Sequence, residues 1–164
     1  SENIDVLNTK DLTRTAIFDA FKNHTYTMFY IQVHSTESFQ DLETGTIYAS
    51  EIAELTTGSL FTINHGCSTG NWLKAYKTRE RNTAMSFVFG KSVGQAVVAN
   101  VRTGMVYGQN ELYERIFTGD YLGKAYLVGK KAAELEMNTN YPDGKIVSGV
   151  TFIGNPFVYV NPKK

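Results

Sequence analysis

Residues 60–67 read Leu-Phe-Thr-Ile-Asn-His-Gly-Cys, and the rest of the chain can be interpreted outward from them. The mostly apolar run 60–64, with polar and turn-forming residues on either side, predicts a short buried strand. His65, Gly66 and Cys67, the chain's single cysteine, follow where that strand ends. In open α/β sheets, sites lie outside the carboxyl ends of the strands. This stretch therefore joins a predicted core strand to residues that can carry chemistry.

Strands and helices alternate on both sides of this stretch. Apolar runs predict further strands at 28–33, 95–101, 150–154 and, at the end of the chain, 157–160. Helical spacing and capping residues predict helices over 12–23 after Asp11, 51–55 after Ser50, 83–90, and 111–137 with a break near Gly119. Residues 35–48 are polar and predict a long loop. The order predicts one α/β domain spanning residues 1–164, with a mostly parallel sheet and helices on both faces.

The composition excludes several classes of function. Sixteen basic and sixteen acidic residues balance, so no broad electrostatic footprint for nucleic acid or anionic membranes is present. No apolar run is long enough to span a bilayer, and the polar start of the chain has no signal-peptide pattern. A single cysteine allows no intrachain disulfide.

The predicted strand ends collect the residues with catalytic chemistry. The first strand ends at His34, the second at His65-Gly66-Cys67, the third at 100–103 and the fourth at 154–156. A cysteine nucleophile needs a histidine within hydrogen-bond reach. We expect Cys67 to be the nucleophile and His34 its general base. His65 competes, because residues i and i+2 of a strand point the same way, but it lies earlier in the strand and is expected to pack under a helix.

Two other interpretations remain open at this stage. A lone cysteine is most often a small buried hydrophobe, and either histidine could be a hydrogen-bonded structural residue. His34, His65 and Cys67 could also supply three ligands to Zn²⁺, although no second cysteine or fourth ligand stands at metal-motif spacing. We expect no metal and no other cofactor.

Several segments together resemble the gingipain-type family of caspase-like cysteine peptidases. They are His34-Ser35, the loop after it, the predicted helix near 49–55, and the run Asn64-His65-Gly66-Cys67-Ser68-Thr69-Gly70-Asn71-Trp72. Cys67 follows His34 by 33 positions, a spacing that suits the family. Residues 95–103 and the segment Gly154-Asn155-Pro156-Phe157 resemble later parts of its domain. The likeness covers about residues 12–160.

The resemblance implies a caspase-like three-layer sandwich that lacks its N-terminal strands, so that the chain is a domain half. It implies a cysteine endopeptidase that forms an acyl-enzyme, with the backbone amides of Ser35 and Cys67 holding the oxyanion. It also implies a secreted or periplasmic location. Two residues depart from the family pattern: Ser35 replaces a glycine and Asn155 replaces an aspartate. These departures favour a second hypothesis, a catalytically silent caspase-like domain used for binding or assembly.

Partners follow from position and from the same resemblance. By position, Asn100, Arg102, Thr103 and Tyr107 would wall the pocket for the substrate residue before the cut, where Arg102 either favours an acidic side chain or is a solvated loop charge. We expect a peptide or protein substrate, and neither nucleic acid nor a membrane span. The strand 28–33 would expose an apolar edge, which predicts cover from a separate N-terminal chain of the same precursor or from a second copy.

Overall fold

The computed structural model describes residues 5–8, 10–92, 94–102, 109–140 and 149–160. Helices and strands are interspersed along these segments, as expected for an α/β domain. The helices are α1 Arg14–Asn23, α2 Ala49–Glu54, α3 Trp72–Thr78, α4 Thr83–Phe89, α5 Gln109–Phe117 and α6 Leu122–Asn140. The strands are β1 Tyr26–Ile31, β2 His34–Ser35, β3 Phe39–Asp41, β4 Thr46–Tyr48, β5 Ser59–Asn64, β6 Ala96–Asn100 and β7 Val150–Gly154.

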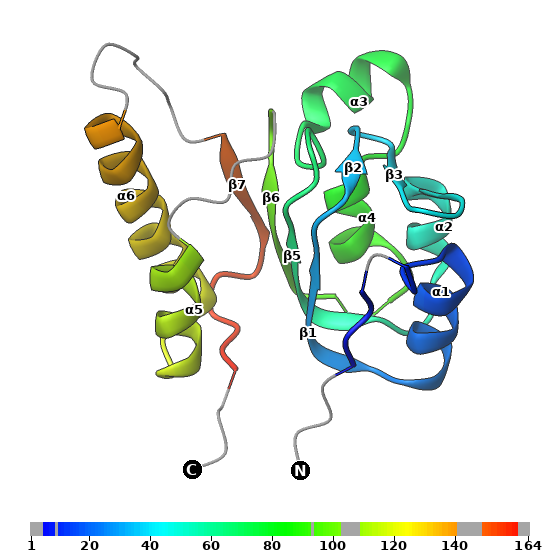
Figure 1. Ribbon diagram of the computed structural model, residues 1–164, viewed down its shortest axis with the longest axis horizontal. Helices are drawn as coiled ribbons and strands as arrows, with labels where there is room; N and C mark the ends of the chain where they lie inside the picture. Colours follow the sequence, from blue (N-terminus) through cyan, green and yellow to red (C-terminus); the bar gives the residue numbers. More distant parts are fainter. Residues whose placement is uncertain (1–4, 9, 93, 103–108, 141–148, 161–164) are drawn as a thin grey trace.

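The central sheet has the strand order β1-β5-β6-β7 (Figure 1). β1, β5 and β6 are parallel, with Tyr30 opposite Ile63 and Ile63 opposite Val98, whereas β7 runs antiparallel to β6. The prediction of a mostly parallel sheet is confirmed. The carboxyl end of β7, however, lies at the opposite edge of the sheet, because Gly154 pairs with Ala96 at the start of β6. The expectation that residues 154–156 join the other strand ends was therefore wrong.

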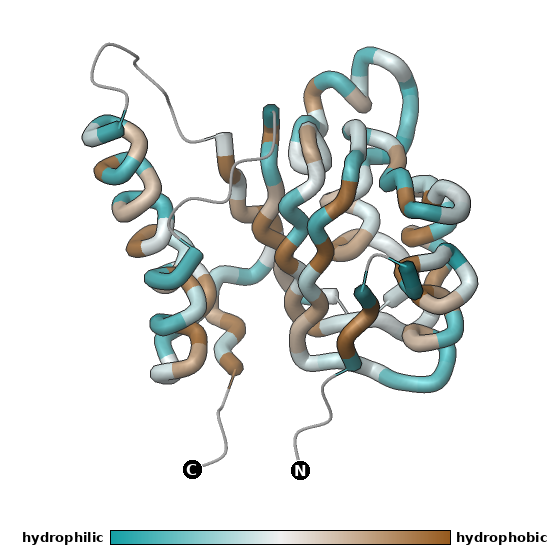
Figure 2. The backbone as a smooth tube through the Cα atoms, viewed as in Figure 1, coloured by the Kyte–Doolittle hydropathy of each residue, from teal (hydrophilic) through white to brown (hydrophobic). Residues whose placement is uncertain are grey.

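Helices cover both faces of the sheet, so the molecule has three layers (Figure 1). On one face, buried residues of β5 and β6 pack against α5 and α6, in a cluster of Phe61, Ile63, Ala96, Val98, Leu112, Ile116, Leu122 and Ala125. On the other face, α1, α2 and α4 contribute Ile17, Phe21, Ile52 and Phe87 to a second cluster. Burying each large apolar side chain contributes about 1.5–3 kcal/mol. Figure 2 shows hydrophobic stretches along the central strands, while α6 carries hydrophobic and hydrophilic residues in alternation.

The first two helices begin at other residues than the sequence suggested. The hydroxyl of Thr13, not the carboxylate of Asp11, accepts a hydrogen bond from the Ala16 amide at 3.1 Å and starts α1. In α2 the cap position is Tyr48, whose amide donates to the Glu51 carboxylate at 3.0 Å. The free backbone amides of a helix's first turn can donate a hydrogen bond to any acceptor in the right position. Several neighbouring polar residues could supply one, so the sequence left the cap ambiguous.

The segment 35–48, predicted as a loop, instead contains strands β2, β3 and β4, which form a small antiparallel sheet. A tight turn joins β3 to β4, where Gly45 takes a φ of +92° and its carbonyl accepts from the Leu42 amide at 3.0 Å. Strands of two or three residues are too short to show a clear alternation of apolar and polar residues in the sequence. Helix α3 was also missed. Conversely, residues 157–160 form no strand, because the Val158 carbonyl caps the Leu122 amide at 2.8 Å.

Candidate active site

His34 lies just beyond the carboxyl end of β1. That strand ends at Ile31, two residues before the predicted end at 33, and His34 opens β2, opposite Asp41. The side chain of His34 is exposed to solvent. The small sheet thus carries His34 and Ser35 out over the edge of the main sheet, where β2 lies beside the top of β5 in Figure 1.

Cys67 stands in a tight loop that follows β5 and is attached to β6. The amides of Ser68 and Gly70 donate to the carbonyls of Arg102 and Asn100, both at 2.7 Å. Ser68 has a φ of +58°, a conformation that non-glycine residues seldom adopt. Strained backbone of this kind is often found at functional sites. The loop therefore holds the half-buried Cys67 in a set position at the carboxyl edge of the sheet.

Ser35 joins these two segments. Its hydroxyl donates to the Cys67 carbonyl at 3.0 Å. The Ser35 side chain also packs directly on Gly66, where an added Cβ would lie 2.0 Å from Ser35 Oγ. Glycine at position 66 is thus required by the close approach of the two segments. The structure brings the residue next to His34 into contact with the main chain of the candidate nucleophile.

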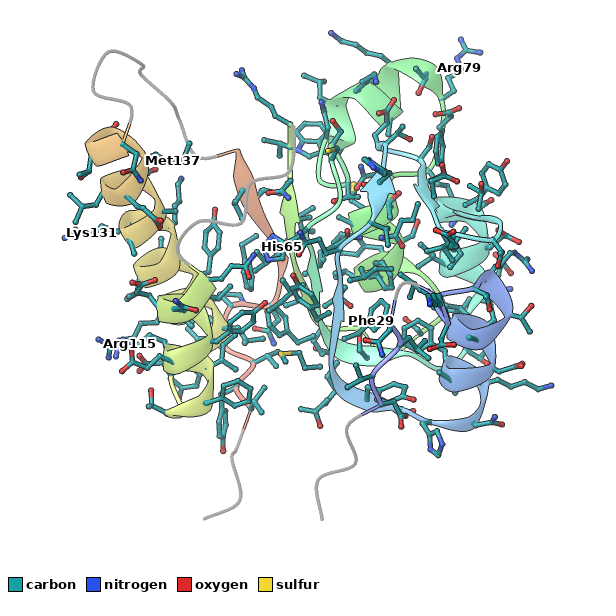
Figure 3. All side chains as sticks on the ribbon, viewed as in Figure 1. Phe29, His65, Arg79, Arg115, Lys131 and Met137 are labelled. Atoms are coloured by element: carbon teal, nitrogen blue, oxygen red, sulfur yellow. The ribbon has the colours of Figure 1, made fainter. Side chains whose placement is uncertain are left out.

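His65, the competing histidine, occupies a different environment. It is 7% exposed, and its ring lies 5.5 Å from that of Tyr30, centre to centre. Burial lowers the pKa of His65 to about 4, because charging an imidazole away from water is unfavourable. Figure 3 shows His65 on the α5 side of the sheet, while Phe29 lies on the α1 side. His65 is a neutral, buried side chain at neutral pH.

Two of the four residues predicted to wall a substrate pocket lie within the described part of the chain. Asn100 is the last residue of β6 and is 1% exposed, whereas Arg102 is exposed. Both support the Cys67 loop through their carbonyls. Thr103 and Tyr107 lie outside the described residues.

A buried polar network, which the sequence analysis missed, supports the site from below. The Asn64 side-chain oxygen accepts from Gln40 Nε2 and from the Gly66 amide, both at 3.2 Å. The Glu37 carbonyl accepts from the Thr83 amide at 2.8 Å and anchors the small sheet to α4. These partners stand 24 and 46 residues apart in the chain. No local pattern signals such long-range contacts.

The zinc hypothesis finds no matching ligand set in the described part of the chain. Nowhere in it do three or more His, Cys, Asp or Glu side chains come close enough together to hold a metal ion. His34, His65 and Cys67 accordingly do not form such a group. A separate finding concerns membranes: over the same residues, no helix is both long and apolar enough to cross one.

The fold that these elements define is the caspase-like α/β fold of the gingipain type. A solved structure that shows the likeness is the crystal structure of the Arg-specific cysteine proteinase gingipain R, with a TM-score of 0.66 and 18% sequence identity. The match covers 92% of this chain and 37% of that one. No protein-family model matches the sequence, and no curated protein matches it either. At this identity the likeness establishes the fold, and function must be argued from the residues.

Proposed function

We propose that this chain carries the catalytic dyad of a gingipain-type cysteine endopeptidase, with Cys67 as nucleophile and His34 as general base. The observation that supports it most directly is the contact of Ser35 with Cys67 and Gly66, which joins the segment after β1 to the loop after β5. Both candidate side chains can reach solvent. Covalent acyl transfer requires a nucleophile and a base within hydrogen-bond reach of each other, and segments at neighbouring strand ends can supply such a pair.

The proposed reaction has two steps. The Cys67 thiolate attacks the scissile carbonyl, the resulting oxyanion is held by the backbone amides of Ser35 and Cys67, and His34 protonates the leaving amine. Water, deprotonated by His34, then attacks the thioester and releases the second product with the Cys67 thiol restored. Asn100, Arg102, Thr103 and Tyr107 are proposed to wall the pocket for the substrate residue before the cut. No metal or other cofactor takes part.

A second candidate is a catalytically silent caspase-like domain used for binding or assembly. Ser35 favours it, because a side chain stands where the resemblance places glycine, and its hydroxyl is already bonded to the Cys67 carbonyl. The rate of alkylation by iodoacetamide at neutral pH separates the two candidates. An activated thiol reacts fast because its pKa is depressed. Alkylation no faster than that of a free cysteine, together with absent peptidase activity, would establish the silent domain.

We further propose that a second polypeptide segment pairs with β1. Within the described sheet, β1 has a partner on one side only, β5. Its sequence, Tyr-Thr-Met-Phe-Tyr-Ile, has neither a proline nor a charge to discourage pairing. The partner is a separate chain of the same precursor or a second copy. Light scattering should then show an assembly, and hydrogen exchange should show that the β1 amides are protected. A monomer with freely exchanging β1 amides would contradict the proposal.

A further inference from the structure

An ion pair joins the small sheet to helix α3, which lies directly above β2 in Figure 1. Glu37 stands in the bend between β2 and β3, three residues after His34, and its Oε2 accepts from Lys74 Nζ at 3.0 Å. Lys74 lies in the first turn of α3, whose first residue follows Cys67 by five positions. The pair therefore links the segment that carries His34 to the segment that carries Cys67.

The two partners of this pair differ in burial. The Glu37 side chain is 6% exposed, whereas the Lys74 side chain is 58% exposed. A carboxylate shielded from water is unfavourable without a cation close by, and Lys74 supplies that cation. Lys74 also stands where the helix dipole disfavours a positive charge, in a first turn that holds no acidic residue. Helix formation does not account for a lysine at this position, whereas the contact with Glu37 does.

The main chain of Glu37 is fixed separately from its side chain. Its carbonyl accepts from the Thr83 amide at 2.8 Å, from the Thr83 hydroxyl at 3.1 Å and from Asn82 Nδ2 at 3.3 Å, all at the start of α4. The Thr36 amide closes the bend by donating to the Phe39 carbonyl at 2.9 Å. A change of the Glu37 side chain should therefore leave the bend intact and alter only its contact with α3.

The first turn of α3 is in turn tied to the Cys67 loop. The Asn71 side chain accepts from the Lys74 amide at 3.1 Å and caps the helix. The Asn71 amide donates to the carbonyl of Ser68, the residue after Cys67, at 2.8 Å. A shift of α3 at Lys74 is therefore transmitted to the candidate nucleophile over a few residues.

Two contacts of different kinds thus hold the two segments of the candidate dyad together. One is the hydrogen bond from the Ser35 hydroxyl to the Cys67 carbonyl, and the other is the ion pair of Glu37 with Lys74. A segment fixed at one point can still turn about that point, whereas a segment fixed at two points keeps its orientation. A nucleophile and its base need orientation as well as proximity.

We propose that Glu37 and Lys74 are positioning residues for the candidate dyad, and that their ion pair sets the orientation of His34 toward Cys67. The inference rests on the proposed peptidase function. Neither residue makes or breaks a bond in the proposed reaction, so loss of the pair should lower kcat and leave KM within about twofold. Misplacing reacting groups by about 1 Å costs about 100-fold in rate, so kcat should fall by about 10- to 100-fold.

The test removes both charges at once. Glu37→Gln combined with Lys74→Met leaves no unpaired charge in the interior, and replacing both partners of a buried pair changes stability little. Urea unfolding checks that this double variant is folded, and steady-state cleavage of a fluorogenic peptide by the full chain gives kcat and KM. Lys74→Arg keeps a cation of similar reach and should retain most of the activity.

A matched control comes from a second lysine–glutamate pair. Lys91 and Glu54 form an ion pair whose side chains are 62% and 58% exposed, and Lys91 precedes β6, away from the carboxyl edge of the sheet. Glu54→Gln combined with Lys91→Met removes the same two charges from the surface. This control variant should change neither kcat nor KM.

A spectroscopic measurement tests the same orientation without cleavage. Cys67 is the only cysteine, so iodoacetamide modifies one site, and the NMR signals of the three histidines can be assigned by substitution. Alkylation should shift the His34 imidazole signal in the unmodified chain. In the chain with Glu37→Gln and Lys74→Met, the shift should shrink by at least half. His24, at the end of α1, should respond in neither chain.

Three results would overturn the inference: a kcat within threefold of the unmodified chain in the Glu37 and Lys74 double variant, an equal loss in the Lys91 control, or an unaltered His34 response. Absence of any His34 response in the unmodified chain would also overturn it, because the two side chains would not be neighbours.

The two proposals fail in different ways. A His34 response that is lost in the double variant, combined with no cleavage by the unmodified chain, would support the positioning role and refute the peptidase. Cleavage that continues undiminished in the double variant would do the reverse.

Discussion

Two histidines are candidate partners of the Cys67 nucleophile, and their surroundings differ in almost every respect. His34 opens a two-residue strand of the small sheet and is exposed to solvent. His65 directly follows the central strand β5, is buried beside Tyr30, and has a ring nitrogen, Nε2, with no hydrogen-bond partner among the described residues. A general base must exchange protons with substrate and water, which suits His34. A buried neutral imidazole is shielded from that exchange, so proximity to the cysteine in sequence is a poor guide to role.

The largest expected effect distinguishes the two histidines by activity. In an active preparation of the intact protein, Cys67→Ala should abolish peptide cleavage, and His34→Ala should lower kcat by about three orders of magnitude or more, because the nucleophile loses its base. His65→Gln should reduce kcat/KM by about tenfold at most. Steady-state cleavage of a fluorogenic peptide measures all three. Equal losses for both histidines would show that the roles assigned here are wrong.

The next effect concerns stability at low pH. The pKa of His65 is about 4 in the folded protein and 6.5 when unperturbed, so the unfolded chain takes up a proton first as the pH falls. Stability is therefore full above pH 6.5 and is lost progressively toward pH 4, by roughly 3 kcal/mol. Urea unfolding at pH 7.5 and at pH 4.5 measures this loss of stability. His65→Gln should reduce the difference in stability between the two pH values, and His34→Gln should leave that difference unchanged. The opposite result would mean that His34, and not His65, is the buried histidine.

A smaller effect probes the contact that ties the His34 segment to the Cys67 loop. Gly66→Ala places a Cβ against Ser35 and should destabilise the fold by about 1–3 kcal/mol through overpacking. Ser35→Gly in the same chain removes the colliding atoms and should recover a part of that loss. Chemical unfolding of the two single variants and the double variant forms a complete cycle. Additive losses would mean that the two segments do not touch in solution.

The smallest effect isolates one hydrogen bond. Ser35→Ala deletes the donor to the Cys67 carbonyl and should cost about 1 kcal/mol of stability. It should lower peptidase activity only a few-fold, because the Ser35 amide is retained. Ser38→Ala, in the bend between β2 and β3, provides a control of the same chemistry away from Cys67. A large loss of activity with unchanged stability would assign the hydroxyl a direct catalytic role.

Much of the fold could be predicted from local pattern. The strands at 28–33, 60–64 and 95–101 and the pair of helices within 111–137 are confirmed, with ends shifted by a few residues. A strand that is covered on both faces of a sheet gives a long apolar run, and helical spacing persists over several turns. Both patterns are therefore easy to detect in the sequence. The small sheet at 34–48 and helix α3 were missed, because two- or three-residue strands and a solvent-exposed helix carry almost no periodicity.

The sequence by itself determined that a cysteine and two histidines follow strands of an α/β domain. Only the tertiary structure decided that β7 runs antiparallel and takes Asn155 away to the other edge, that Ser35 rests on Gly66, and that His34 opens a small second sheet in which it is exposed. The physical reason is the range of the interactions. Strand propensity acts over neighbouring residues, whereas strand direction, close backbone approach and desolvation depend on segments that meet only after the chain has folded.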